Sequence, residues 1–193
     1  VFRLECDGDL FADGTLGTAA ADVAENIPST DSLVAGELVV IDPASNAVLR
    51  SSQPYQSKLI GAVSTLPGVL LGSEIEGYRI ALSGRIPVSV TDENGPIAVG
   101  DAITSSSTAG HGMKSTEPGM IVGFALEAFA GPGSGSVSLF VNTQFYLGSV
   151  VSTDGSTTIL SDDIQIAATG TASATVPGFD SDAFELRGSG WNG

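Results

Sequence analysis

Lysine and arginine are scarce in this sequence. Seven basic residues stand against 22 acidic ones, and the formal net charge is −15. Proteins that bind nucleic acids neutralise phosphates with clustered lysine and arginine side chains, and the sequence contains no such cluster. The composition therefore argues against nucleic acid as a partner.

Cysteine occurs once, as Cys6. A single cysteine allows no disulfide within the chain. Glu5 and Asp7 flank it, whereas a reactive thiolate needs a basic neighbourhood. We therefore expect Cys6 to be a small apolar side chain, with a disulfide between two chains as the alternative.

Histidine also occurs once, as His111, shortly after three serines at 105–107. A catalytic triad needs a nucleophile, a base and an orienting carboxylate, which usually come from separate elements. Here Asp101, the serines and His111 lie close together in sequence, and we interpret the Ser-Thr-Ala-Gly-His-Gly run at 107–112 as a polar loop. The common phosphate-binding, dinucleotide-binding, serine-hydrolase and zinc-protease motifs are missing, and the cysteine and histidine counts are too low for a zinc site. We expect no cofactor.

Long apolar runs are missing as well. No run approaches the roughly 20 residues that span a bilayer as a helix, so we expect no membrane insertion. The sequence shows neither a signal peptide nor an initiator methionine, which we interpret as a processed chain or a piece of a longer one. Charged residues make up 15% of the chain, against about 25% in typical globular proteins. This acidic, charge-poor composition favours an extracellular protein, on a cell surface or a virion.

Short runs rich in valine and isoleucine, which suit strands, dominate the sequence. Residues 78–127 read as strand, turn, strand, loop and strand, with a turn signal at Asn94-Gly95-Pro96. Residues 131–136 predict a flexible break. Further strands are predicted at residues 37–42, 48–50, 59–65, 69–71 and 137–141. The sequence therefore predicts an all-β protein with a compact β-barrel or sandwich-like domain.

The first residues predict a short β hairpin. Apolar and polar residues alternate over residues 2–6, and a turn signal at Asp7-Gly8 precedes a second short strand at residues 10–12. The nearby acidic side chains lack the spacing of a calcium-binding EF-hand loop. We favour turn chemistry over a metal site for these three residues: Asp7, Asp9 and Asp13.

Residues 15–26 are small and alanine-rich, which fits either a short helical turn or an extended linker. Asp22 and Glu25 form the one carboxylate pair of interest. If the segment is helical, their spacing of three residues places both on one face. The alternative is a solvated capping or linker pair.

The composition and the spacing of turn signals divide the chain into an N-terminal hairpin and linker (1–26), a main β domain (27–148) and a C-terminal β extension (149–193). Turn signals about 8–12 residues apart predict a small meander or sandwich in the extension. Its large apolar residues either pack on the chain's own core or insert into a neighbouring chain as assembly contacts. These residues are Phe179, Phe184 and Trp191.

Six sequence pieces in the main domain follow one another in a familiar order. They are GELVVID at 36–42, KLIGAVSTLPG at 58–68, ALSGRIPVSV at 81–90, ENGPIAVGD at 93–101, GHGMKS at 110–115 and GMIVGFALE at 119–127. Over residues 1–142 this order resembles the C-terminal domain of tailed-phage neck-appendage and tail-fibre proteins, the peptidase G2 or intramolecular-chaperone autoprocessing family, and related bacterial tail-fibre-like surface proteins. The resemblance implies a β-rich, trimeric module on an extracellular fibre.

Autoprocessing members of that family cleave before a serine that precedes Asp-Tyr-Ala-Glu. By position, the resemblance assigns the two acids to Asp22 and Glu25. Alanine stands at the serine position, as Ala21, and Val23 stands at the tyrosine position. Without a hydroxyl at Ala21, serine-mediated cleavage cannot run there, so we expect a relative that keeps the fold and does not cleave.

These observations together predict a structural, self-assembling subunit or segment of an extracellular fibre, filament or surface appendage. The partner would be the chain itself, as a homotrimer or a filament. One alternative is an autoproteolytic fibre-maturation domain that uses Asp22 and Glu25. Another is a module that binds cell-surface glycans or a host surface, although aromatic residues, which stack on sugars, make up 6% of the chain.

Overall fold

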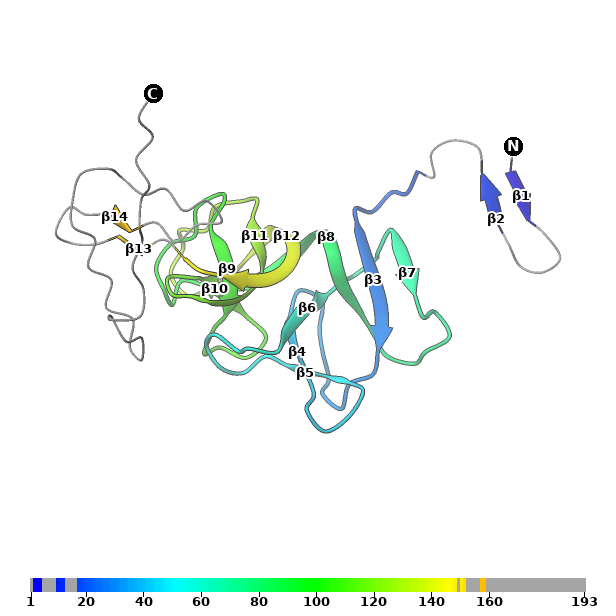
Figure 1. Cartoon of the computed structure of the whole chain (residues 1–193), viewed down its shortest axis with the longest axis horizontal. Coiled ribbons are helices and arrows are strands. Elements are labelled where there is room, and N and C mark those ends of the chain that lie inside the picture. Colours follow the sequence, from blue (N-terminus) through cyan, green and yellow to red (C-terminus); the bar gives the residue numbers. More distant parts are fainter. Residues whose placement is uncertain (1, 5–9, 13–16, 149, 152–156, 159–193) are drawn as a thin grey trace, which may run out of the picture. The chain divides into compact units, whose positions relative to one another are not determined.

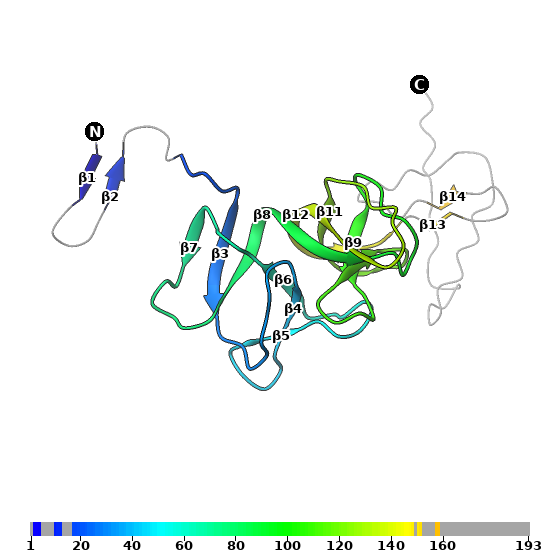
Figure 2. The same ribbon diagram turned by 180° about the vertical axis from the view of Figure 1, so that it is seen from behind.

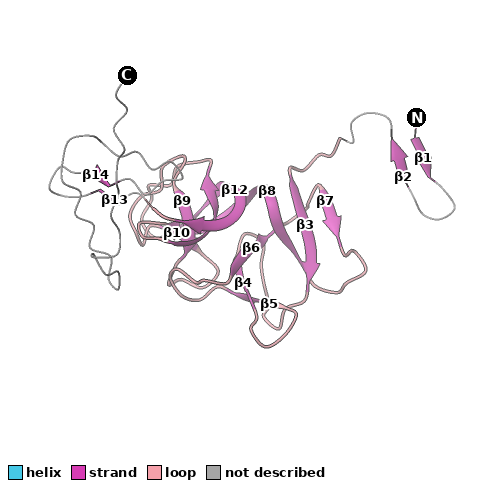
Figure 3. Cartoon of the chain, in the orientation of Figure 1, coloured by secondary structure: helices cyan, strands magenta, loops and turns pink. Residues whose placement is uncertain are grey.

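The computed structural model describes residues 2–4, 10–12, 17–148, 150–151 and 157–158. The chain separates into two compact units, Val1–Ser149 and Val150–Gly193. Every regular element in the described part is a strand, as Figure 3 shows by colour. The predicted all-β class is confirmed.

Twelve strands lie in the first unit and two short ones in the second. In chain order they are β1 (Phe2–Leu4), β2 (Leu10–Ala12), β3 (Asp22–Ile27), β4 (Leu38–Ile41), β5 (Val48–Arg50), β6 (Leu59–Val63), β7 (Val69–Leu71), β8 (Tyr78–Thr91), β9 (Ala102–Ser105), β10 (Gly112–Lys114), β11 (Gly119–Ala125), β12 (Ser134–Tyr146), β13 (Val150–Val151) and β14 (Thr157–Thr158).

Ten of these strands form one sheet in the order β10-β9-β11-β12-β8-β6-β4-β5, with β3 attached to β8 and β7 attached to β3 (Figure 1). Most pairs are antiparallel, whereas β3–β7 and β10–β8 are parallel. The β10–β8 contact is a single pair, Gly112 with Val90, and it curls one end of the sheet into a partial ring. β1 with β2 and β13 with β14 form separate two-stranded sheets.

Strand β8 is the centre of the large sheet. Its C-terminal half pairs with β12 from Ser83 to Thr91, and its N-terminal half pairs with β3 and β6. Ile86, Val88 and Val90 are buried in the core, whereas Pro87 between them is exposed and Ser89 half-buried, the period expected for a strand with one buried face.

Two apolar clusters stabilise the domain. The larger combines the inward residues of β8, β11 and β12 with those of β4 and β6, and it also includes Ile97 and Ile103. The smaller gathers around Ile80, with Leu33, Val39, Val48 and Val63 against it.

Two expectations need correction. Residues 22–27 form strand β3 within the large sheet, not a helical turn or a linker, because their backbone pairs with β8 on one side and β7 on the other. Strand β12 begins at Ser134, so the flexible break expected at 131–136 already belongs in part to a strand. There its first residues pair with Val90 and Thr91.

Gly84 is needed where the beginning of β3 pairs with β8, opposite Asp22. Its φ is +107°, and a Cβ built there would lie 2.2 Å from the carbonyl oxygen of Ala21. That same carbonyl accepts a hydrogen bond from Arg85 N–H at 3.0 Å. The close approach of the two backbones therefore leaves no room for a side chain.

We predict that Gly84→Ala lowers the free energy of unfolding by about 2–5 kcal/mol, because backbone strain and overpacking add. Gly100→Ala is the control. Gly100 also has a positive φ, +89°, but no atom lies within 4 Å of its built Cβ, so its substitution costs about 1 kcal/mol. Urea unfolding of both variants measures the two changes in the free energy of unfolding. Equal losses of stability would show that the close approach of the Ala21 carbonyl oxygen to Gly84 adds no cost.

Candidate functional site

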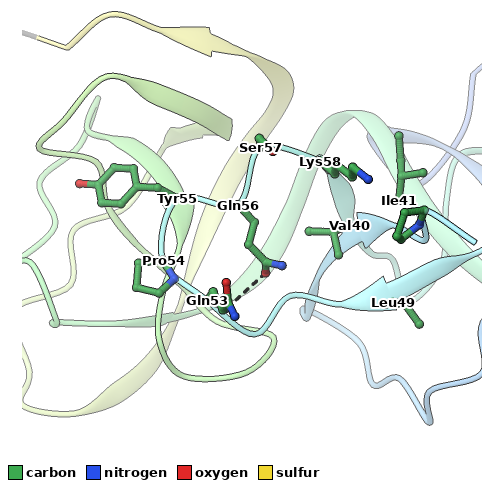
Figure 4. Close-up of a pocket in the computed structure, with 10 residues that line it drawn as sticks. Val40, Ile41, Leu49, Gln53, Pro54, Tyr55, Gln56, Ser57 and Lys58 are labelled. Carbon is green, nitrogen blue, oxygen red and sulfur yellow. Dashed lines mark hydrogen bonds between the residues drawn. The ribbon is translucent and has the colours of Figure 1, made fainter. Parts of the chain in front are cut away.

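A hollow of about 410 Å³ lies between β4, β5 and the loop that follows them (Figure 4). This is near the lower end of the usual range for ligand pockets, about 300–1,000 Å³. Its wall combines apolar residues of the strands with polar residues of the loop. The lining residues are Val40, Ile41, Pro43, Leu49, Gln53, Pro54, Tyr55, Gln56, Ser57 and Lys58.

Tyr55 fixes the loop in an uncommon backbone conformation. Its φ is +52°, a value that L side chains rarely adopt. Its N–H donates to the carbonyl oxygen of Ser105 at 3.1 Å, and the N–H of Gln56 donates to Ser105 Oγ at 2.9 Å. The end of β9 therefore clamps the loop, and such strain persists when the surroundings over-determine it.

The Tyr55 hydroxyl joins three segments of the chain. It accepts hydrogen bonds from Asn94 Nδ2 at 3.0 Å and from Thr116 N–H at 2.9 Å, and it lies 3.1 Å from Thr116 Oγ1. Asn94 Nδ2 also donates to the carbonyl oxygen of Lys114 at 3.0 Å. This network ties the loop to the turn after β8 and to the segment after β10.

The Gln56 side chain closes the loop from within. Its Oε1 accepts the N–H groups of Ser52 at 2.7 Å and Gln53 at 3.2 Å, and Figure 4 draws the second contact. The wall of the hollow is therefore preorganised by hydrogen bonds.

The chemistry of the hollow is that of binding. Lys58 is its one cationic residue, and the lining includes no carboxylate, histidine or cysteine. Val40, which belongs to the larger core cluster, and Leu49, which packs against that cluster, supply apolar lining. The arrangement can accept a small apolar group, and the lining offers no acid–base pair.

Asp42 lies beside the hollow, in the turn between β4 and β5. Its Oδ2 accepts the hydroxyl of Ser45 at 2.6 Å, and its Oδ1 accepts the N–H of Ala44 at 2.9 Å. These two hydrogen bonds, with a smaller effect of Lys58, hold the pKa of the Asp42 carboxyl below its ordinary value.

The structure does not bring Asp22 and Glu25 together. Both lie on β3, where the burial pattern alternates, so positions 22 and 24 are buried while 23 is exposed and 25 half-buried. Asp22 is 5% exposed, and its Oδ2 has no hydrogen-bond partner among the described residues. Side chains three residues apart on a strand point to opposite faces, so the shared face expected for a helix is absent here.

The serines near His111 have structural hydrogen bonds. Ser106 Oγ donates to the carbonyl oxygens of Thr108 and His111, at 3.1 and 3.0 Å. Ser105 Oγ accepts from the loop described above, and His111 Nδ1 lies 2.8 Å from the carbonyl oxygen of Ala109. The predicted polar loop fits these contacts, and within the described part no serine hydroxyl bonds to the imidazole.

The remaining candidates lie outside the described residues: Cys6, Asp7, Asp9, Asp13, Phe179, Phe184 and Trp191. Within the described ranges, no group of three or more histidine, cysteine or acidic residues is placed to hold a metal ion. The same ranges contain no helix that could cross a membrane.

Sequence reasoning missed an exposed apolar surface on β3 and β7. Val23, Val69 and Leu71 lie on one face, at 37%, 41% and 47% exposure. The apolar run at 69–71 predicted the strand, but no pattern showed that its outward side would remain uncovered. The Tyr55 network was also missed, because its partners are far apart in sequence.

Comparison with protein-family models, with curated proteins and with solved structures finds no match. The resemblance to phage tail-fibre domains therefore stays a prediction from sequence.

We predict that Tyr55→Phe lowers the free energy of unfolding by about 1–2 kcal/mol, because Asn94 and Thr116 lose a shared hydrogen-bond partner. Tyr78→Phe is the matched control, since the Tyr78 hydroxyl makes no hydrogen bond within the described residues, and it should cost less than about 0.5 kcal/mol. Chemical denaturation measures both. Equal effects would remove the structural role assigned to the Tyr55 hydroxyl.

We further predict that Ser45→Ala raises the Asp42 pKa toward its ordinary value, because the largest cause of the shift is removed. A depressed folded-state pKa means that ionised Asp42 stabilises the turn above the unfolded-state pKa. This contribution is lost as the pH falls through the folded-state pKa. An NMR titration of the carboxyl carbon checks the shift, with Ser57→Ala as a neighbouring control that should leave it unchanged. An Asp42 pKa equal in wild type and Ser45→Ala would contradict the assignment.

Proposed function

We propose that this protein is a structural, self-assembling subunit or segment of an extracellular fibre, filament or surface appendage. The observation that carries the proposal is the apolar face shared by Val23, Val69 and Leu71 at the margin of the large sheet. Exposed apolar faces of this kind mark interaction sites. The extracellular setting is supported by the composition and by the sequence resemblance.

Further apolar exposure favours the same proposal. Twelve large apolar side chains are at least one-third exposed among residues 17–148. Four of them fall within the short segment from Leu66 to Ile75, which contains β7. Exposed apolar side chains that are scattered singly over a surface need no binding partner. Four of them within one short segment favour a partner that covers this segment.

The polar residues of the domain add indirect support. Buried Glu37 pairs with Arg50 at 2.8 Å, and Lys114 pairs with Asp101 at 2.9 Å. Together with the Tyr55 network, these contacts hold loops in place within the domain. They give a stiff unit, as a building block requires.

A module that binds glycans is the second candidate, and an aromatic surface on β11 and β12 favours it. Phe124 pairs with Phe140 across the strands, and its ring packs edge-on to Tyr146 with centroids 6.2 Å apart. Arg85 is opposite Phe140 on β8, and Phe140 is 45% exposed. Aromatic rings beside a hydrogen-bond donor suit sugar stacking.

We predict that the full chain forms species larger than a monomer and that salt promotes them, because copies with a net charge of −15 repel one another at low ionic strength. Mass photometry and negative-stain imaging at low and high sodium chloride provide the measurement. Three-chain particles would indicate a trimer, and long fibres a filament. A monomer at every concentration and salt would overturn self-assembly and make the Phe140 surface the next one to test.

A further inference from the structure

We propose that two copies of this chain pair through strand β7, in antiparallel register about a two-fold axis at Leu70. The inference rests on the proposed self-assembly and names the surface that carries it. Its occupant is a second copy of the same chain. Three features of the β3–β7 margin lead to this assignment.

The first feature is the open edge of β7. Among the described strands, β7 pairs with β3 alone, whereas β3 lies between β7 and β8 (Figure 2). An edge strand offers its outward N–H and C=O groups to another strand. Proteins usually protect such edges with lysine, proline or a bulge. Residues 69–71 are Val-Leu-Leu, without lysine, proline or a bulge, so this edge is limited only by its length of three residues.

The second feature is the side-chain row beside that edge. Val23 is the direct neighbour of Val69, and Glu25 is the direct neighbour of Leu71. Directly paired residues share a face of the sheet. The exposed face of the β3–β7 pair therefore carries three apolar side chains and one carboxylate, while Ala24 points to the opposite face and is fully buried.

The third feature is the register that a two-fold axis imposes. With Leu70 opposite its own copy, Val69 meets Leu71 of the second copy. Four side chains then lie next to one another across the four strands: Val23 and Val69 of one copy, followed by Leu71 and Glu25 of the second copy. The two-fold axis repeats this row of four with the copies exchanged. Apolar side chains fill the centre of both rows, and each row contains one carboxylate. For a chain with 22 acidic residues, a register that sets no two glutamates opposite each other avoids the repulsion between like charges.

The same register makes a cross-link test specific. Directly opposite residues of an antiparallel pair have Cα atoms about 4.5–5.5 Å apart, within the range that a disulfide spans, roughly 4.4–6.8 Å. In a Cys6→Ser background, the double variant Val69→Cys, Leu71→Cys should therefore form disulfide-linked dimers of the full chain under mild oxidation. Either single variant should not, because its cysteine lies opposite an apolar residue.

Non-reducing gel electrophoresis and intact mass measure the cross-link. Dimers in the double variant, with at least tenfold less in each single variant, support the pairing. Dimers of equal yield in a single variant would overturn the antiparallel register. No dimer in the double variant, under conditions where wild type assembles, would overturn this surface and leave the proposed function intact. A monomeric wild type would overturn both.

A charge variant tests the same surface without cysteine chemistry. Leu71→Lys should weaken association at least tenfold, although it lowers the net negative charge that opposes assembly. Val99→Lys is the control, because Val99 is 66% exposed on a turn far from β7 in sequence. Circular dichroism and thermal unfolding show whether each variant stays folded. Equal association of the two variants would contradict the assignment to β7.

Discussion

The central strand β8 is the constraint on which the rest of the described domain depends. Its fourteen residues pair with β12 along one half and with β3 and β6 along the other. This one strand therefore joins two groups of strands, and each of the two apolar clusters includes residues of β8. Gly84 allows this, because its missing side chain lets the carbonyl oxygen of Ala21 approach β8.

The polar chemistry of the domain serves the loops that this sheet leaves between its strands. Tyr55, Asn94 and Thr116 hold three of these loops to one another, and the network stabilises the wall of the hollow beside β4. The sole histidine belongs to the same pattern. The carbonyl oxygen of His111 accepts a hydrogen bond from the Ser106 hydroxyl, and its Nδ1 lies 2.8 Å from the carbonyl oxygen of Ala109. These side chains position backbone, which is why the surface, and not a catalytic cleft, supports the functional proposal.

That surface combines strong negative charge with an apolar margin. Charge keeps copies apart at long range and is screened by salt, whereas burial of Val69 and Leu71 acts at contact. A short strand whose pairing is weak alone can still contribute to an assembly in which each copy makes several contacts. The proposed two-fold pairing through β7 supplies one such contact.

The sequence by itself determined the all-β class and most strand positions. The short runs Val-Leu-Arg at 48–50 and Val-Leu-Leu at 69–71 coincide with β5 and β7 because β-branched and apolar side chains suit a pleated backbone. It did not determine the strand at 22–27, which begins inside the alanine-rich stretch at 15–26, because local propensity is weak there and pairing with β8 decides the strand. The tertiary structure also decided the candidate sites. Tyr55 meets Asn94 and Thr116 through contacts between distant segments. Val69 stays 41% exposed on a strand that, among the described strands, pairs with β3 alone. The local sequence pattern shows which residues favour a strand. Which other strands pair with that strand depends on the path of the whole chain.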